Sequence, residues 1–248
     1  MGSREMENSI YIALSRQTAL RREMSLVANN IANVNTTGFQ RELGVYATAQ
    51  TQNKLSPTLD FVIDHGTAVS FEPGGVRDTA NDFDLAISGS GFFGVDDGSA
   101  TKYTRNGALS LSPDNQLITR EGYAVIDEGN QPIVIPRDGR KMQIAQDGTI
   151  SVGNEVIAKM MLVEFDSMDL LQKAGDSMFE TTERPKDPLN SSILQRKLEA
   201  ANVTPVKELV RMIDIQRAYD AVKAFMDREA DRQRTVVSRL GRPAPAGQ

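Results

Sequence analysis

The stretch from Ser9 to Val34, SIYIALSRQTALRREMSLVANNIANV, decides the fold of this chain. Apolar or small residues recur in it at alternating steps of three and four, and one polar residue, Gln17, occupies a position of the same series. The other members are Ile10, Ala13, Leu20, Met24, Val27, Ile31 and Val34. This heptad spacing predicts a long helix whose apolar seam packs on other helices. Ser9 suits its N-cap, and Gly38 suits its end.

The other end of the chain carries a second predicted helix. Thr204 is suited to cap it, and Pro205 fits its first turn because proline needs no backbone donor there. Its seam is interrupted by Glu229 and Gln233 and consists of Met212, Ile215, Tyr219, Val222, Met226, Val236 and Leu240. We expect the two terminal helices to pair as a coiled coil. The heptads leave open whether the partner is the other helix of the same chain or a neighbouring copy.

Between the helices the pattern changes to short alternating runs separated by turn residues. The predicted strands are 83–87, 109–111, 117–119, 123–126, 133–135, 144, 150–152 and 160–165. The turn signals are Pro113-Asp114-Asn115, Glu128-Gly129-Asn130, Asp138-Gly139 and Asp147-Gly148. These features predict an antiparallel β-rich middle and therefore an α+β chain.

The expected organisation follows from these zones. We predict a flexible start, an N-terminal helix, an extended linking segment, a β-rich central part, a C-terminal helix and a disordered tail, at residues 1–8, 9–38, 39–80, 81–200, 201–240 and 241–248.

Composition excludes several classes of protein. The chain has 248 residues, a formal net charge of −5, one histidine and no cysteine. Disulfides and thiolate metal sites are excluded, and His65 alone makes a multi-histidine metal site hard to build. The net charge argues against a nucleic-acid partner. No run is apolar enough to span a membrane, and the first residues lack the pattern of a cleaved secretory signal.

Two motifs invite a chemical interpretation that their surroundings do not support. Gly89 to Gly94 spells GxGxxG, but a turn follows where a dinucleotide site needs a helix, so we expect a bent strand or a close backbone approach. The acid pairs Asp82 with Asp84 and Asp96 with Asp97 lack the spacing of a calcium loop. We therefore expect no catalytic residue, no cofactor site and no metal site. A secreted β-rich enzyme, with carboxylates that converge only in space, stays the alternative.

Asparagines gather at the end of the first predicted helix. They are Asn29, Asn30, Asn33 and Asn35. Asparagine is a mediocre helix former, because its amide competes for backbone hydrogen bonds. Two explanations remain open: a fraying helix end with one asparagine as cap, or a polar network that sets the register between helices.

Several stretches of the chain resemble the flagellar rod and hook protein family. The most specific is ANNIANVNTTGF at Ala28 to Phe39. Further matches to the family lie at 89–95, 103–109, 117–119, 122–123, 198–206, 209–213 and 216–219. Residues 8–17 and 20–24 resemble the proximal-rod type more than the distal-rod type, which is the second choice. A hook-type subunit and a cytoplasmic coiled-coil adaptor are further alternatives.

The resemblance implies a structural subunit of the basal-body rod, not an enzyme. It implies terminal helices around the export channel, with the β part outside, and torque transmission within the periplasmic space. The implied partners are other rod subunits, copies of the chain itself and the flagellar type III export apparatus, which exports such subunits without a cleaved signal peptide. The expected subunit interface comprises Ile10, Ala13, Gln17, Leu20, Met24, Val27, Asn30, Ile31, Asn33, Val34, Gly38, Phe39, Met212, Ile215, Tyr219, Val222 and Met226.

Overall fold

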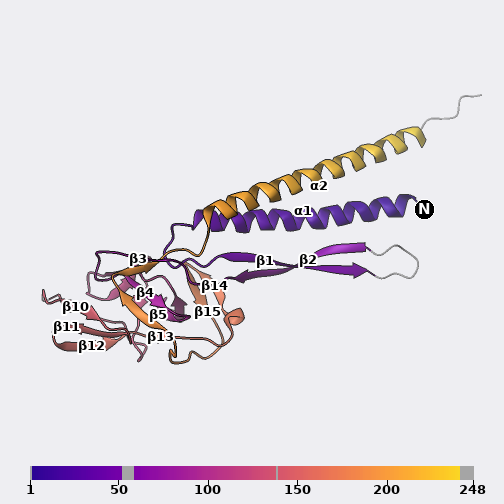
Figure 1. Ribbon diagram of the computed structural model, residues 1–248. Helices are drawn as coiled ribbons and strands as arrows, with labels where there is room; N and C mark the ends of the chain where they lie inside the picture. Colours follow the sequence, from indigo (N-terminus) through magenta and orange to yellow (C-terminus); the bar gives the residue numbers. More distant parts are fainter. Residues whose placement is uncertain (1, 52–58, 138, 241–248) are drawn as a thin grey trace, which may run out of the picture. The chain divides into compact units, whose positions relative to one another are not determined.

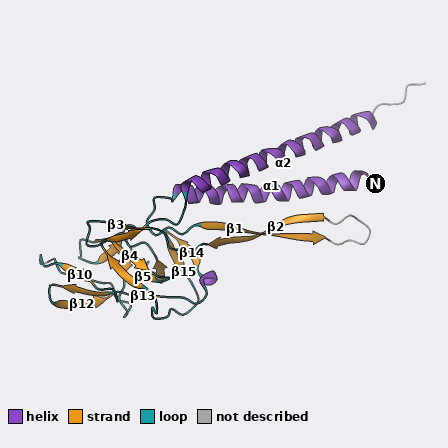
Figure 2. Cartoon of the chain, in the orientation of Figure 1, coloured by secondary structure: helices purple, strands orange, loops and turns teal. Residues whose placement is uncertain are grey.

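The computed structural model of the chain describes residues 2–51, 59–137 and 139–240. The chain divides into two compact units. The first comprises residues 1–31, 42–68 and 205–248, and the second comprises residues 32–41 and 69–204. Long helices form both ends of the chain and strands form the part between them (Figure 2). This α+β class agrees with the prediction. The predicted disordered tail at 241–248 lies outside the described residues.

The first unit contains two helices and a strand pair. Helix α1 runs from Gly2 to Ala32 and helix α2 from Pro205 to Leu240, while strand β1 (Glu42–Thr51) pairs with β2 (Leu59–Val69). Helix α2 begins at the predicted proline, whose fixed φ suits the first turn. Helix α1 begins earlier than the Ser9 cap predicted for it. Over the described residues, neither helix is long and apolar enough to cross a bilayer.

The predicted seams face inward in this unit. Ala13, Val27 and Ile215 are buried. The remaining apolar seam positions with a described burial are half-buried, namely Ile10, Leu20, Met24, Ile31, Met212, Tyr219, Val222 and Met226. Gln17 is half-buried too, whereas Leu14, which lies off the seam, is exposed. The heptad spacing therefore predicted correctly which face of each helix is covered.

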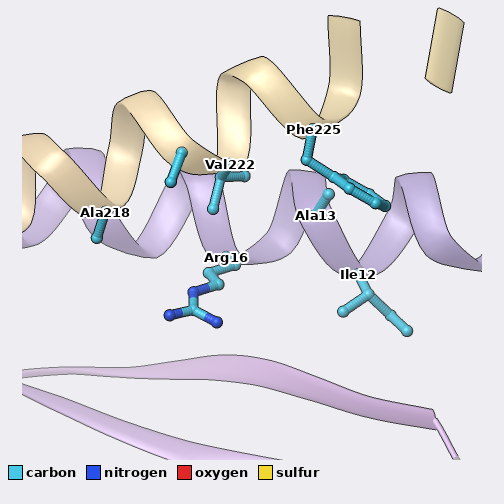
Figure 3. Close-up of a pocket in the computed structure, with 7 residues that line it drawn as sticks. Ile12, Ala13, Arg16, Ala218, Val222 and Phe225 are labelled. Carbon is cyan, nitrogen blue, oxygen red and sulfur yellow. The ribbon is translucent and has the colours of Figure 1, made fainter. Parts of the chain in front are cut away.

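The prediction that α1 and α2 pair as a coiled coil is wrong. The helices meet in antiparallel contact where Arg211 Nη2 donates to Glu23 Oε1 at 2.8 Å and Arg21 Nη2 donates to the Tyr219 hydroxyl at 3.4 Å. Towards the beginning of α1 they diverge (Figure 1). An open groove of about 460 Å³ lies between them there, in place of interlocked seams (Figure 3).

The physical reason is that α1 shares its contacts with the β1–β2 pair. The Tyr46 hydroxyl donates to the carbonyl oxygen of Ala19 at 3.4 Å. Arg22 forms a 2.7 Å salt bridge with Asp64 and donates to Thr67 Oγ1 at 3.4 Å. A heptad pattern specifies which face of a helix is apolar but not what covers it. With two partners for one helix, the continuous knobs-into-holes packing of a coiled coil is not formed.

The second unit is an assembly of short strands. The largest sheet has the order β14-β15-β6-β5-β9-β8-β7, with β13 also paired to β5. Its strands are β5 (Phe92–Asp96), β6 (Thr101–Thr104), β7 (Leu109–Leu111), β8 (Leu117–Thr119), β9 (Ala124–Val125), β13 (Leu162–Val163), β14 (Gln172–Gly175) and β15 (Met178–Glu180). A 3₁₀ turn at Met168–Leu170 precedes β14.

Three smaller sheets complete this unit. They are β10-β11-β12, β16-β4 and β17-β3. Their strands are β3 (Val76–Asp78), β4 (Leu85–Ser88), β10 (Met142–Ile144), β11 (Thr149–Val152), β12 (Glu155–Lys159), β16 (Ser192–Gln195) and β17 (Lys197–Glu199). Each strand pair with a described register in this unit is antiparallel, as predicted.

Strand β5 separates two hydrophobic cores. Successive side chains of a strand point to opposite faces, so Phe92 and Phe93 enter different clusters. Phe93 joins the larger, mainly aliphatic cluster with Leu85 and Val95. Phe92 joins an aromatic cluster and stacks edge-on to Phe179 with ring centroids 5.8 Å apart. One predicted strand did not form: residues 133–135 contribute a single isolated bridge at Val134.

Candidate functional site: a buried polar clasp

A cluster of polar side chains, three of them buried and one half-buried, joins segments that are far apart in the sequence. Its members are Gln40, Arg105, Glu199 and Asn202, and we call this set the polar clasp. Gln40 follows α1, Arg105 follows β6, Glu199 ends β17, and Asn202 lies just before α2. All four belong to the second unit. The clasp therefore gathers the chain where it leaves α1 and where it approaches α2.

Arg105 and Glu199 form the centre of the polar clasp. Both side chains are only 1% exposed, and Arg105 Nη2 lies 2.8 Å from Glu199 Oε2. Arg105 Nε donates to the two carboxylate oxygens at 3.2 and 2.9 Å. Nη1 donates to the carbonyl oxygen of Gly91 at 2.9 Å, and Nη2 also donates to that of Gly89 at 3.1 Å. A buried pair of this kind is costly to desolvate, and these extra acceptors offset that cost.

The Glu199 carboxylate also holds the backbone of a third segment. Its Oε1 accepts hydrogen bonds from Gln40 Nε2 at 3.3 Å and from the amide of Gly74 at 3.0 Å. Its own carbonyl oxygen accepts from the amide of Gly38 at 2.9 Å. One residue thus ties the exit from α1 to the segment that follows β2.

Asn202 completes the clasp with four polar contacts, three of which share the two hydrogens of its amide nitrogen. Its Nδ2 donates to Gln40 Oε1, to the Ser70 carbonyl and to the Glu72 carbonyl at 2.8, 2.7 and 2.8 Å. Its Oδ1 accepts from the backbone amide of Arg41 at 2.7 Å. The segments after α1, after β2 and before α2 are therefore held by one side chain.

Gly38 and Phe39, both predicted as site residues, border the polar clasp. Gly38 has φ +65°, and a β-carbon there would lie 2.6 Å from Arg105 C and from Asn106 N. Only glycine allows this combination of a left-handed backbone and a close approach. Lys173 Nζ lies 4.1 Å from the centre of the Phe39 ring, a cation–π contact, and donates to the Gln40 carbonyl at 3.1 Å.

The asparagine cluster acts differently from both explanations offered by the sequence. Asn30 is fully buried, and its Nδ2 donates to the Glu42 carbonyl at 2.9 Å while its Oδ1 accepts from the Glu42 amide at 2.9 Å. Its side chain thus pairs with the backbone of β1, as a neighbouring strand would, and not with another helix. Asn33 accepts from Thr36 Oγ1 at 3.1 Å in the turn after α1.

The polar clasp is the part that sequence reasoning missed. Charged residues usually stay at the surface, so Arg105 and Glu199 gave no sign of burial. The sequence offered one signal of a closely packed site, the glycines near Arg105. Gly107, for example, admits the Leu85 carbonyl oxygen to within 1.9 Å of where a β-carbon would stand. The GxGxxG stretch contributes to the polar clasp, because Gly89 and Gly91 supply carbonyl oxygens to Arg105. Residues 92–96 after it form strand β5, not the helix that a dinucleotide site needs.

The adjacent acids Asp96 and Asp97 are turn formers. Asp97 Oδ1 accepts from Ser99 Oγ at 2.7 Å and from the backbone amides of Ala100 and Ser99 at 2.8 Å. These bonds lower the pKa of Asp97 to about 2, and the bond from the Ser99 hydroxyl has the largest effect. Within the described part of the chain, no group of three or more His, Cys, Asp or Glu residues is placed to hold a metal ion.

We expect Ser99→Ala to raise the pKa of Asp97 from about 2 towards the ordinary aspartate value of about 4, because it removes the strongest of these bonds. A carboxyl pKa depressed in the folded state stabilises the fold above the unfolded pKa, and this contribution is lost as the pH falls towards 2. A carboxyl-carbon NMR titration measures the shift. Ser110→Ala, at an exposed serine of β7, is the control. An unchanged Asp97 titration in Ser99→Ala would contradict the assignment.

Comparison with known proteins places the chain in a family. Three family models match it: "Flagella basal body rod protein" at residues 10–40, "Flagellar hook protein FlgE/F/G D1 domain" at 86–152 and "Flagellar basal body rod FlgEFG protein C-terminal" at 194–239. Gln40 lies in the first matched range, Arg105 in the second, and Glu199 and Asn202 in the third. The three matched regions meet in the polar clasp.

Individual relatives cover nearly the whole chain. The flagellar basal-body rod protein FlgF of Caulobacter vibrioides is 41% identical, over 96% of this chain and 99% of the relative. The FlgF protein of Mesorhizobium japonicum is 32% identical over 95% and 99%. A FlgG rod protein from Buchnera aphidicola subsp. Schizaphis graminum is 30% identical over 86% and 92%. The chain therefore belongs to the flagellar basal-body rod protein family, in its FlgF group.

Proposed function

We propose that this chain is a subunit of the proximal part of the flagellar rod, which assembles with other rod subunits and with copies of itself and carries out no catalysis. Membership in the rod protein family makes it a structural rod subunit located in the flagellar basal body. The observation that carries the finer assignment is the end-to-end similarity to FlgF-named relatives. The distal rod is the second candidate, because FlgG-named relatives also cover most of the chain.

The polar clasp supports a role in passing torque along the rod. A rotating shaft needs subunits whose chain segments do not slip against one another under load. The clasp holds three such segments through hydrogen bonds. The bonds to the Glu199 carboxylate are charge-assisted, and the bond from Arg105 is buried, where it is stronger than in water. We infer that it keeps the second unit stiff where its chain connects to α1, β2 and α2.

The absence of catalysis is inferred from membership in a family of structural rod proteins, together with the surroundings of two titratable sites. The most buried charged pair, Arg105 with Glu199, is enclosed by protein hydrogen bonds. His65 is exposed on β2. Neither arrangement leaves a general acid or base beside a space for a substrate.

The remaining parts of the proposal follow from the family resemblance. We propose that the rod containing this chain lies in the periplasmic space, that the terminal helices line the export channel, and that the flagellar type III apparatus exports the chain without a cleaved signal peptide.

The predicted subunit interface leads to a mutational test. We expect Val27→Asp to reduce incorporation of the chain into basal bodies, because it places a charge at a side chain that is 1% exposed. The second unit should keep its unfolding midpoint. Ala28→Asp, at the exposed neighbouring position, is the control and should incorporate normally. Incorporation of Val27→Asp at the wild-type level would show that assembly does not require the packed seam.

Purification of basal bodies from the source bacterium tests the proposed function. Mass spectrometry shows whether the chain is present, and labelled electron microscopy shows where along the rod it lies. A position at the proximal end is the expected result. A distal position would assign the chain to the second candidate, and its absence from basal bodies would overturn the proposal.

A further inference from the structure

The last stretch of the second unit pairs with strands from the beginning of that unit. Strand β16 pairs with β4, and β17 pairs with β3, so that each pair forms a two-stranded sheet. The second unit ends at residue 204, and we call its closing residues 191–204 the strap. Two early strands thus receive their hydrogen-bonding partner from the end of the unit.

The strap also contributes side chains to the hydrophobic core. Ile193 is buried in the larger cluster, together with Leu85 and Phe93. Its backbone amide donates to the carbonyl oxygen of Gln146 at 2.9 Å, and Leu198 is buried further along the strap. Removal of buried side chains of this size from a packed core leaves a cavity that the surroundings fill only in part. The core is therefore incomplete without the strap.

Gln195 joins the strap to a further sheet. Its Nε2 donates to the carbonyl oxygens of Asp82 and Met142 at 2.9 and 3.4 Å, and its Oε1 accepts from the amide of Ile144 at 3.2 Å. Met142 and Ile144 belong to β10, whereas Asp82 lies just before β4. The strap thus connects the β10-β11-β12 sheet to the segment that leads into β4.

The polar clasp depends on the strap as well. Arg105 is buried, and Glu199, the carboxylate that pairs with it, lies 94 positions later in the chain. Without Glu199, burial of Arg105 would place a charge in the protein interior with no countercharge, which is strongly unfavourable. Asn202, the other clasp residue of the strap, lies 162 positions after its partner Gln40. The clasp can therefore form only after the strap is present.

We propose that the strap controls when the second unit folds: the residues before it have no stable fold until it joins them. The ribosome makes the chain from its N-terminus, and domains generally fold as units during synthesis. At about 5–20 residues per second, Glu199 follows Arg105 by roughly 5–20 s. The second unit consequently stays unfolded through most of the synthesis of the chain.

This inference rests on the proposed function and gives the late strap a role in it. A rod subunit that leaves the cell through an export channel passes more readily while it is unfolded. A unit whose early strands folded by themselves would be compact before synthesis ends. The strap delays that step through the order of the sequence alone. The rod assignment does not depend on this delay, because it is tested separately by the presence of the chain in basal bodies.

A disulfide that ties the strap to β4 in advance tests the proposal. Ser88 and Ser192 lie opposite each other on β4 and β16, and the chain has no cysteine of its own. The full-length Ser88→Cys, Ser192→Cys variant is oxidised while folded, unfolded in urea and diluted. Near-ultraviolet circular dichroism of the aromatic cluster around Phe92 follows its refolding. The oxidised chain should refold about tenfold faster than its reduced form, because the long loop before the strap is already closed.

A disulfide within a local hairpin is the matched control. Ser110 and Ile118 lie opposite each other on β7 and β8. The oxidised and reduced forms of the Ser110→Cys, Ile118→Cys variant should refold at the same rate, because this disulfide leaves the strap free. Equal acceleration by the two disulfides, or no acceleration by the one at the strap, would overturn the proposal and leave the rod assignment standing.

A conservative change in the strap gives a second kinetic test in the full chain. Ile193→Val should slow refolding about threefold, since the strap takes part in the rate-limiting step. Leu189→Ala, at an 86% exposed side chain just before the strap, is the control and should leave the refolding rate unchanged. If Ile193→Val refolded at the wild-type rate and only unfolded faster, the strap would dock onto a unit already formed, and the proposal would be wrong.

Pulsed hydrogen exchange during refolding of the wild-type chain shows the order of folding directly. Mass spectrometry compares peptides from β5 and β6 with peptides from β16 and β17. We expect both sets to gain protection in the same kinetic phase. Protection of β5 and β6 before the strap would show that the sheet folds without it and would overturn the proposal.

Discussion

Arg105→Met is expected to lower the free energy of unfolding of the second unit by about 3–5 kcal/mol, because it leaves the Glu199 carboxylate buried without its countercharge. The carbonyls of Gly89 and Gly91 lose their donors in the same step. Urea unfolding measures the loss. Near-ultraviolet circular dichroism of the aromatic cluster around Phe92 reports on this unit, and the chain has no tryptophan to complicate the signal.

A matched arginine provides the control for this prediction. Arg140 pairs with Glu155 at 3.4 Å, and both side chains are largely exposed. Arg140→Met should cost less than about 1 kcal/mol, as surface ion pairs do. A similar loss from both variants would show that the polar clasp contributes no more than a surface pair. We also expect Arg105→Met cells to swim poorly, since a loosened unit transmits less torque.

Gly38→Ala is expected to have the second large effect, a loss of about 3 kcal/mol or more from the free energy of unfolding. Two costs combine: an alanine at φ +65° is strained, and its β-carbon would press on the backbone of Arg105 and Asn106 at 2.6 Å. Backbone atoms of the second unit have to shift to relieve this contact. The same urea titration measures the change, and soft-agar motility gives the functional readout.

Gly98→Ala separates the two costs. Gly98 has φ +85° in an exposed turn, with nothing near the position of a β-carbon. Its replacement should cost only about 1 kcal/mol, from the left-handed backbone alone. The difference between the two variants measures the close approach at Gly38. Equal losses would mean that this approach does not contribute to stability.

Much of the local structure was predictable from short-range patterns. Pro205 marked the start of α2, and the turns predicted at Asn115, Asn130 and Gly148 adopt the positive φ that their residue types tolerate. The seam positions predicted the covered faces of both helices. These features depend on neighbours within one or two helical turns, or within one β-turn, so the sequence displays them directly.

Some elements left no such pattern. The strands β14 to β17 are only three or four residues long, so their alternation was too short to detect. Strands β1 and β2 fell inside a stretch assigned only an extended form, because nothing local showed that they pair with each other and contact α1.

The sequence alone determined the class of the fold, the two terminal helices with their inward faces, and the family to which the chain belongs. The tertiary structure alone decided what covers those faces, and it replaced the expected coiled coil with an antiparallel contact, a strand pair and an open groove. It also brought Arg105 to Glu199 and Gln40 to Asn202, pairs 94 and 162 positions apart in the chain. Periodicity is a local property, whereas the partner of a buried charge depends on how the whole unit packs.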